Sequence, residues 1–200
     1  MILVSKKAPN FIASAVLPDG KIVNDFNLYE YSSGKITVLF FWPMDFTFVC
    51  PSELIAFNNL YSEFNDRNVH IIGVSVDSVY VHNAWRNIEP KHGGIGTVKF
   101  PMISDITKAI QKSYGVEHPE LTIAFRASFI IDKDGIIRHQ SINDLPIGRN
   151  ILEIIRIIDA FKLYKKSGKV CPANWSTEKE SMQATPEGVK KYLSRNFQKI

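Results

Sequence analysis

Two cysteines are the residues of this sequence with the clearest capacity for chemistry. Cys50 and Cys171 lie about 120 residues apart in a chain of 200 residues. Such a pair can be inert, can ligate a metal or can form a redox couple, and composition alone favours the inert interpretation. In a reducing compartment a stable structural disulfide is not expected. The residues around each cysteine therefore have to decide between these interpretations.

The residues around Cys50 indicate a reactive thiolate. Pro51 is favoured in the first turn of a helix, so Cys50 faces unpaired N–H groups and the positive end of the helix dipole, which stabilise a thiolate. Glu53 suits the same first turn and can hold a nearby arginine. If the chain turns before the helix, the hydroxyl of Thr47 can bond the sulfur or a bound oxygen. Pro43 removes a competing N–H and shields the site from water.

Arg126 is the best candidate for a cation beside that sulfur. It precedes an apolar run that ends at Asp132, and a charge in a buried strand is costly unless it is paired. Taken alone, an arginine at a sheet edge that points to solvent is the simpler interpretation. If the thiolate attacks a peroxide, however, the rate must come from polarising the O–O bond, because a more stable thiolate is a weaker nucleophile. Arginine suits this task better than lysine, since its fork can hold the sulfur and a peroxide oxygen together.

Two motifs make the sequence closely similar to the typical two-cysteine peroxiredoxins, in particular their bacterial alkyl hydroperoxide reductase branch. The first is the segment 43–53 around Cys50, and the second is the segment 170–175 around Cys171. Both motifs are highly specific, and the resemblance extends over nearly the whole chain. Arg126 falls where the family has its active-site arginine.

The resemblance implies a thioredoxin fold and a thiol-specific peroxidase that reduces hydrogen peroxide and organic hydroperoxides in antioxidant defence. Cys50 is then the peroxidatic cysteine and forms a sulfenic acid when it attacks the substrate. After the first helical turn unwinds, Cys171 of the partner subunit acts as the resolving cysteine and closes an intersubunit disulfide. The other catalytic residues implied are Pro43, Thr47 and Arg126, with Glu53 in support.

The same resemblance implies the partners of the chain. A thioredoxin-like protein or a dedicated flavoprotein reductase restores the thiols, and the subunits form a homodimer that assembles into a decamer of five dimers. Phe46, Phe48 and Trp85 are candidates for packing near the interface between dimers, and a plain core role for them is equally open.

No cofactor and no metal are predicted. The glycines at 93, 94 and 96 lack the spacing of a dinucleotide-binding loop, which leaves a flexible connection as the better interpretation. The five histidines show no ligand spacing that would indicate a zinc site.

The elements that position these residues alternate between strands and helices. Pro18-Asp19-Gly20 and Lys133-Asp134-Gly135 lie between apolar runs and predict two hairpins. Further strands are expected at 36–42, at 69–76 and near residue 101, and helices at 51–65, through residue 85, at 107–114, from residue 150 onward and at 189–197. Asn150 with Glu153 predicts a capped helix start. This pattern indicates an α/β sandwich with a central mixed β-sheet flanked by helices.

The last part of the chain is predicted to be an extension. After Gly168 the pattern becomes irregular and then polar, with too few apolar residues for a core of its own. We therefore divide the chain into a thioredoxin-fold peroxidase domain at 1–165 and a C-terminal extension at 166–200. The extension carries Cys171 and is expected to dock on a partner subunit.

Composition excludes several other classes of protein. The net charge is +4, but Lys and Arg are scattered, so no nucleic-acid partner is expected. No apolar run is long enough to span a bilayer. The first ten residues have no apolar segment behind them that would make a secretory signal, so the expected location is the cytoplasm.

Two other functions compete with the peroxidase. Some members of the resembling family act as holdase chaperones once they are overoxidised, which makes protein binding the alternative from another class. A disulfide oxidoreductase that acts on proteins is the third possibility, and the absence of a Cys-x-x-Cys motif argues against it.

Overall fold

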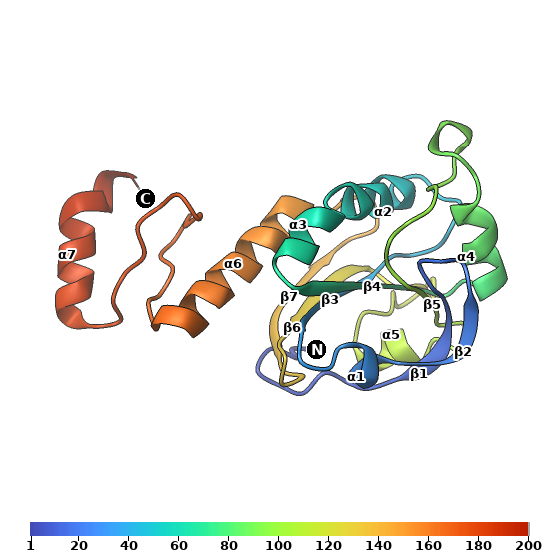
Figure 1. Ribbon diagram of the computed structural model, residues 1–200, viewed down its shortest axis with the longest axis horizontal. Helices are drawn as coiled ribbons and strands as arrows, with labels where there is room; N and C mark the ends of the chain where they lie inside the picture. The colour runs from blue at the N-terminus through green and yellow to red at the C-terminus, as the bar shows by residue number, and fades with distance from the viewer. Residues whose placement is uncertain (200) are drawn as a thin grey trace. The chain divides into compact units, whose positions relative to one another are not determined.

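A seven-stranded mixed sheet organises the first part of the molecule (Figure 1). The structure is a computed structural model that describes residues 1–199, and residues Met1–Arg149 form one compact unit. The strand order is β2-β1-β5-β4-β3-β6-β7, with β3 parallel to β4 and antiparallel to β6. The strands are β1 (Ile12–Val16), β2 (Ile22–Asn27), β3 (Ile36–Phe41), β4 (Val69–Ser75), β5 (Met102–Ser104), β6 (Arg126–Ile131) and β7 (Ile137–Asn143). The predicted mixed sheet is confirmed.

Both predicted hairpins are present. β1 and β2 pair antiparallel around Pro18-Asp19-Gly20, and β6 and β7 pair antiparallel around Lys133-Asp134-Gly135. Gly20 and Gly135 have φ of 89° and 79°, a conformation that glycine adopts at little steric cost. The turn residues therefore fix where each pair of strands begins.

The helix that carries Cys50 is shorter than predicted. The helices of this unit are α1 (Leu28–Tyr31), α2 (Cys50–Asn59), α3 (Tyr61–Asp66), α4 (Val79–Arg86) and α5 (Ala109–Ser113), with a 3-10 turn at Pro90–His92. The single helix expected at 51–65 was wrong, because α2 ends at Asn59 and is capped by Leu60, whose N–H bonds to the carbonyls of Ala56 and Asn58. In Figure 1, α2 and α3 lie on one side of the sheet and α5 lies on the other.

Aromatic rings fix α2 on the sheet. Side chains alternate between the two faces along β3, and Phe40 stacks on Phe57 of α2 with ring centroids 4.2 Å apart. Trp42 lies beside Phe40, with centroids 5.6 Å apart. Gly73 on the neighbouring strand leaves room for both rings, since a Cβ there would lie 2.7 Å from Trp42 and 2.8 Å from Phe40. The start of α2 is therefore held by a packed core.

The second compact unit begins at Asn150. It contains α6 (Ile151–Ser167), α7 (Pro186–Asn196) and a 3-10 turn at Phe197–Lys199. Asn150 caps α6 as predicted and accepts hydrogen bonds from the N–H groups of Leu152 and Glu153. α7 begins earlier than expected, because Thr185 caps it and Pro186 suits its first turn. The functional boundary at 165/166 stays a prediction.

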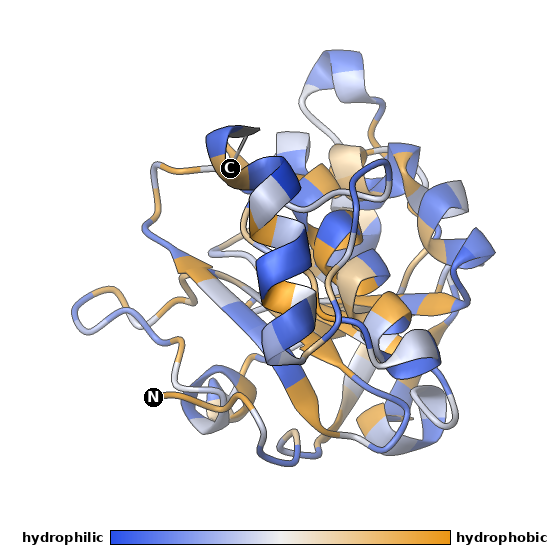
Figure 2. Ribbon diagram, turned by 90° about the vertical axis from the view of Figure 1, so that its left-hand side faces the viewer, coloured by the Kyte–Doolittle hydropathy of each residue, from blue (hydrophilic) through white to orange (hydrophobic). Residues whose placement is uncertain are grey.

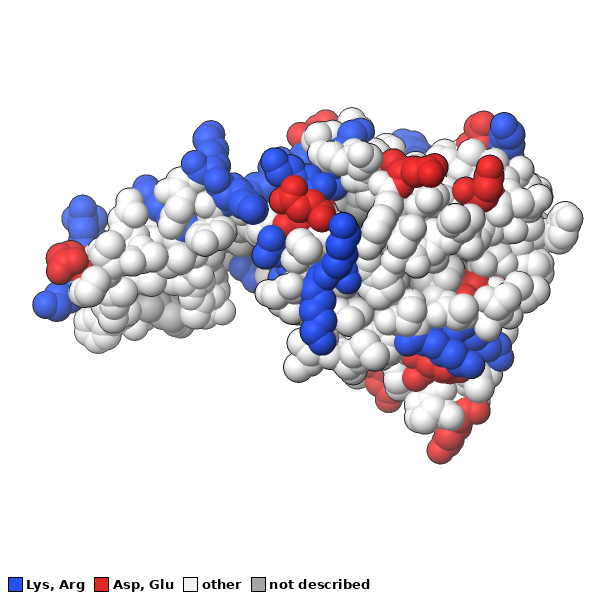
Figure 3. All heavy atoms as spheres, turned by 90° about the horizontal axis from the view of Figure 1, so that it is seen from below, with Lys and Arg blue, Asp and Glu red and all other residues white. Residues whose placement is uncertain are grey.

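Hydrophobic and charged residues are distributed differently over the molecule. In Figure 2 the strands inside the fold are largely orange, and the helices alternate between blue and orange, as half-buried helices do. Figure 3 shows acidic and basic side chains interspersed on the face in view. Within residues 1–199, no helix combines the length and the hydropathy that a membrane span requires.

Candidate active site

Cys50 is the first residue of α2 and its side chain is buried, with 0% exposure. Pro51 follows in the first turn, as the sequence predicted. The sulfur lies at the N-terminal end of α2. Pro51 has no N–H to donate there, and the N–H groups of Ser52 and Glu53 both donate to the carbonyl of Val49, at 3.1 and 3.4 Å.

Thr47 lies against the sulfur. Its Oγ1 is 2.8 Å from Cys50 Sγ and also 2.8 Å from the carbonyl oxygen of Met44. A hydroxyl has one proton to donate. It can donate that proton to either of these two acceptors, and its lone pairs then face the other one. The turn that would bring Thr47 to the sulfur is present.

Arg126 reaches the sulfur from β6. Its Nη1 is 3.2 Å from Cys50 Sγ and 2.9 Å from Glu53 Oε2, and its Nε donates to the carbonyl of Leu145 at 2.6 Å. The side chain of Arg126 is 5% exposed. The interpretation of Arg126 as a solvent-facing edge residue is excluded, because β6 lies between β3 and β7.

Glu53 forms ion pairs with two arginines, Arg126 and Arg149, near the sulfur. Arg149 donates to both carboxylate oxygens of Glu53 from its side chain, at 2.8 Å each, and from its backbone N–H at 2.9 Å. Burial alone would raise the pKa of Glu53, but the hydrogen bonds and charge of Arg149, together with the charge of Arg126, lower it below its ordinary value. Glu53 is therefore ionised at neutral pH.

The buried charged side chains around Cys50 do not cancel one another. Two guanidinium groups and one carboxylate leave one positive charge in a region where all three side chains are at most 5% exposed. Buried charge is costly unless it is paired. The network of Glu53, Arg126 and Arg149 therefore presents a net positive charge beside the Cys50 sulfur.

Arg149 was missed in the sequence. Besides Glu53, it binds the carbonyl oxygens of Phe41 and Ala127 at 2.8 Å each, and its guanidinium lies 5.1 Å from the ring centroid of Phe40. Arg149 follows β7 and immediately precedes the cap of α6. No local motif marks it, and only the return of the chain to α2 shows its role.

A pocket of about 480 Å³ opens beside the sulfur's two donors. It is lined mainly by apolar side chains and contains Thr47 and Arg126 in its wall. Pro43, a predicted site residue, is buried and lines the same pocket. The remaining lining residues are Met44, Phe48, Val49, Ile123, Leu145 and Pro146. A small molecule in this pocket would meet the two groups that touch Cys50.

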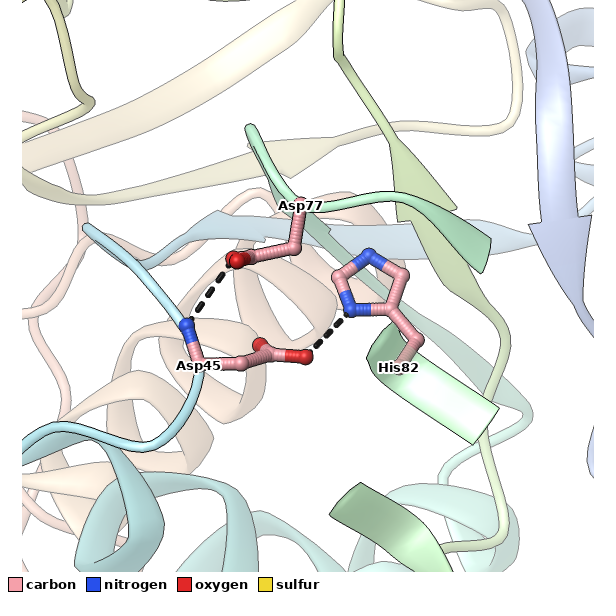
Figure 4. A group of neighbouring side chains, drawn as sticks. All are labelled: Asp45, Asp77 and His82. Atoms are coloured by element: carbon pink, nitrogen blue, oxygen red, sulfur yellow. Dashed lines mark hydrogen bonds and ion pairs between the residues drawn. The ribbon is translucent and has the colours of Figure 1, made fainter. Parts of the chain in front are cut away.

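Behind the turn lies a largely buried cluster that the sequence did not indicate. Asp45, Asp77 and His82 place ligand-type atoms within 4.8 Å of one another, and Figure 4 shows Asp45 bonded to both of the others. The histidines were judged to lack ligand spacing, and these three residues come from two different segments of the chain. Asp45 belongs to the same turn as Thr47.

The three aromatic residues near this turn differ in exposure. Trp85 is fully buried, and its ring centroid is 5.8 Å from that of Phe46. Phe46 is 52% exposed and Phe48 is 98% exposed. Trp85 therefore has the core role that the sequence left open, while Phe48 projects from the turn.

Cys171 lies in the second compact unit in a different setting. It is partly exposed and is a free thiol, as is Cys50. Its neighbour Val170 pairs with Met182 in an isolated bridge, and Sγ lies 3.7 Å from the carbonyl of Ala160. Burial raises the pKa of Cys171, and the charge of Arg156 opposes part of that rise.

Comparisons with known proteins agree with this geometry. Residues 4–140 match the AhpC/TSA family, and residues 160–195 match the C-terminal domain of 1-Cys peroxiredoxin. Alkyl hydroperoxide reductase C of Buchnera aphidicola subsp. Schizaphis graminum is 62% identical over 197 residues, which cover 98% of this chain and 100% of that protein. The protein of the same name from Helicobacter pylori strain J99 is 46% identical and covers 100% of both chains.

Solved structures give the same result. The crystal structure of reduced Plasmodium vivax 2-Cys peroxiredoxin matches this fold with a TM-score of 0.93 at 46% identity, covering 97% of this chain and 100% of that one. The fold is therefore thioredoxin-like, as expected. The chain belongs to the AhpC/TSA family and is a peroxiredoxin, an antioxidant thiol peroxidase.

Proposed function

We propose that Cys50 is the peroxidatic cysteine and that it reduces hydrogen peroxide and small organic hydroperoxides. The observation that carries this proposal is the placement of Cys50 Sγ between Thr47 Oγ1 at 2.8 Å and Arg126 Nη1 at 3.2 Å, beside an apolar pocket. The thiolate attacks the terminal oxygen of the peroxide, so that an S–O bond forms as the O–O bond breaks. The sulfur is oxidised to a sulfenic acid, and the leaving oxygen takes a proton to become an alcohol or water.

Arg126 acts on the breaking bond, and Thr47, which donates its proton to the carbonyl of Met44, offers its lone pairs to the O–H of the peroxide. Negative charge grows on the leaving oxygen in the transition state, and donors that are already oriented stabilise it without reorganisation. Glu53 and Arg149 hold the Arg126 guanidinium in place. Pro43 in the pocket wall keeps water from the sulfur.

The buried state of Cys50 requires a conformational step after the attack. With 0% exposure in the folded helix, the sulfenic acid cannot meet a second sulfur until the first turn of α2 unwinds. Cys171 of the partner subunit then attacks the sulfenic sulfur as the resolving cysteine, and an S–S bond forms as hydroxide leaves and becomes water. Two electrons from a thioredoxin or a dedicated flavoprotein reductase restore both thiols.

This cycle sets the proposed organisation of the chain. Residues 1–165 make up the peroxidase domain, and residues 166–200 dock on the partner subunit of a homodimer. Five dimers form a decamer, with the exposed Phe46 and Phe48 as candidates for contacts between dimers. The free thiols fit a reducing compartment, so we place the reaction in the cytoplasm.

Two cysteine variants test the proposal. Substoichiometric hydrogen peroxide should convert the unsubstituted chain to a disulfide-linked dimer on a non-reducing gel. Cys50→Ser should abolish peroxide consumption. Cys171→Ser should allow one rapid turnover and then stop without forming the dimer. Rapid consumption of peroxide by Cys50→Ser would contradict the proposal.

A further inference from the structure

The Met44–Asp45 peptide connects the buried cluster of Figure 4 to the reactive sulfur. On its nitrogen side, Asp45 N–H donates to Asp77 Oδ2 at 2.9 Å. On its carbonyl side, Met44 O lies 2.8 Å from Thr47 Oγ1, which in turn lies 2.8 Å from Cys50 Sγ. One peptide group therefore joins a carboxylate to the hydroxyl that contacts the sulfur. Hydrogen bonds in such a chain polarise one another.

The Asp45 side chain fixes this peptide against the core. Asp45 Oδ1 accepts from Trp42 Nε1 at 2.8 Å, and Oδ2 lies 2.7 Å from His82 Nδ1. His82 Nε2 lies 3.2 Å from the carbonyl of Ile103, and the side chains of Asp45 and His82 are both 0% exposed. The cluster is thus anchored to Trp42, which follows β3, and to α4 and β5.

The Asp45–His82 pair is enclosed by its hydrogen-bond partners. The carbonyl of Ile103 can only accept, so it suits the tautomer of His82 that carries a proton on Nε2. Burial raises the pKa of Asp45, and the hydrogen bond from His82 opposes part of that rise. Each polar atom of the pair already has a protein partner, which argues against a metal site.

The backbone next to this peptide is strained. Phe46 has a φ of 55°, a left-handed conformation that is unfavourable for a residue with a Cβ. Strain of this kind persists only where the surroundings impose it. Asp45 on one side and Thr47 on the other are both held by the contacts above, and the Phe46 ring lies against Trp85. The turn is therefore kept in one conformation by its neighbours.

We propose that Asp77 is a positioning residue for the peroxidase reaction, which orients the Thr47 hydroxyl through the Met44–Asp45 peptide, and that the buried Asp45–His82 pair anchors that peptide. This inference rests on the proposed role of Cys50. Asp77 itself is held by Ser75 Oγ, which donates to Oδ2 at 2.7 Å. None of the three residues of the cluster touches the sulfur, so their effect is confined to the geometry of the turn.

The experiment compares two reactions of the same sulfur. In a Cys171→Ser background the chain has a single thiol, whose rate constants with hydrogen peroxide and with iodoacetamide can both be measured. Alkylation by iodoacetamide needs the sulfur but no hydroxyl that positions a peroxide. Misplacing a reacting group by about 1 Å can cost about 100-fold in rate. Asp77→Ala should therefore slow the peroxide reaction by about tenfold or more, while alkylation changes by less than about twofold.

Conservative variants make the result specific to orientation. Asp77→Asn keeps an acceptor for Asp45 N–H and should restore most of the peroxide rate. Asp45→Asn can donate to His82 Nδ1 and accept from Trp42, so it should also stay close to the unsubstituted rate, whereas Asp45→Ala should not. Asp25→Ala on β2 is the control, because Asp25 is exposed and far along the sheet from β3.

The outcomes separate this inference from the proposed function. If Asp77→Ala lowers both reactions equally, or if neither asparagine variant restores the peroxide rate, Asp77 and Asp45 act only on stability and the inference is wrong. An unchanged peroxide rate in Asp77→Ala would also overturn it. If the unsubstituted chain shows no rapid peroxide reaction that depends on Cys50, the proposed function fails whatever the aspartates do.

Discussion

The two cysteines of this chain have opposite surroundings. Cys50 is fully buried, with a hydroxyl and a guanidinium within 3.2 Å of its sulfur and a second arginine behind Glu53. Cys171 is partly exposed, and burial raises its pKa while Arg156 acts on it only through charge. One thiol is therefore prepared to attack a small molecule that enters a pocket. The resolving role that we propose for Cys171 needs little activation, because a sulfenic acid is itself reactive.

Removing the Arg126 guanidinium should change the difference in reactivity between the two cysteines more than any other substitution. Arg126→Ala is expected to lower the rate constant of Cys50 with hydrogen peroxide by about 10²–10³-fold, the usual cost of losing an oriented donor to a developing charge. Stopped-flow measurements in the Cys171→Ser background would test this. In the Cys50→Ser background the same substitution should leave the alkylation of Cys171 unchanged.

The control for that prediction is Arg67→Ala. Arg67 forms an ion pair with Glu63 on the surface helix α3, so its loss should alter neither reaction by more than about twofold, since exposed pairs contribute little. An equal loss of reactivity at both cysteines in Arg126→Ala would mean that the two thiols do not differ in the way described.

The second-largest effect is expected on the free energy of unfolding, when the carboxylate of Glu53 is removed. Glu53→Gln leaves two buried guanidinium groups without their counter-charge, which should lower the free energy of unfolding by about 3–5 kcal/mol at pH 7. Because the folded pKa of Glu53 lies below its unfolded value, its contribution is fully present above about pH 4.3 and is lost as the pH falls through the folded pKa.

Urea unfolding of both chains as a function of pH would check this. The difference between the unsubstituted chain and Glu53→Gln should be constant near neutral pH and should shrink on acidification. Equal stability at pH 7 would show that the carboxylate is not needed to hold the arginines, and the charge argument for Cys50 would lose its basis.

The smallest effect is expected at Cys171. Its raised pKa predicts that alkylation in the Cys50→Ser chain increases with pH through the range 7 to 8.5 without reaching a plateau, because the thiolate is the reacting form. Arg156→Gln removes the charge that favours the thiolate and should slow alkylation at pH 8 by about twofold to threefold. Lys162→Gln on the same helix is the control. A plateau below pH 7.5 would make Cys171 an activated thiol and remove the contrast with Cys50.

Most of the fold could be predicted from the sequence because its signals are local. The apolar run of β3 and the Pro18-Asp19-Gly20 turn lie within short stretches of chain, and each produced the expected element. The end of α2 at Leu60 was not visible, since neither glycine nor proline marks it. Which hydrogen bonds close a helix depends on how the next helix packs, which a short window does not contain.

The residues of the candidate site likewise fall into two groups, those with a local sequence motif and those without one. Thr47, Cys50 and Glu53 are close in sequence and could be assigned together, and Arg126 could be placed through its motif. Arg149 and the Asp45–His82 pair depend on contacts between distant segments, 96 and 37 residues apart along the chain. Such residues carry no local pattern, so only the folded arrangement identifies them.

Gly73 gives the reactive centre a dependence on a position that has no side chain at all. Even a methyl group there would push against the rings of Phe40 and Trp42, and through them against the seat of α2 and the hydrogen bond from Trp42 to Asp45. A mutational scan that selects for survival under oxidative stress should therefore find this glycine as intolerant of replacement as residues in the pocket itself. The space that Gly73 leaves free for these two aromatic rings is therefore as necessary to the reactive centre as the sulfur of Cys50.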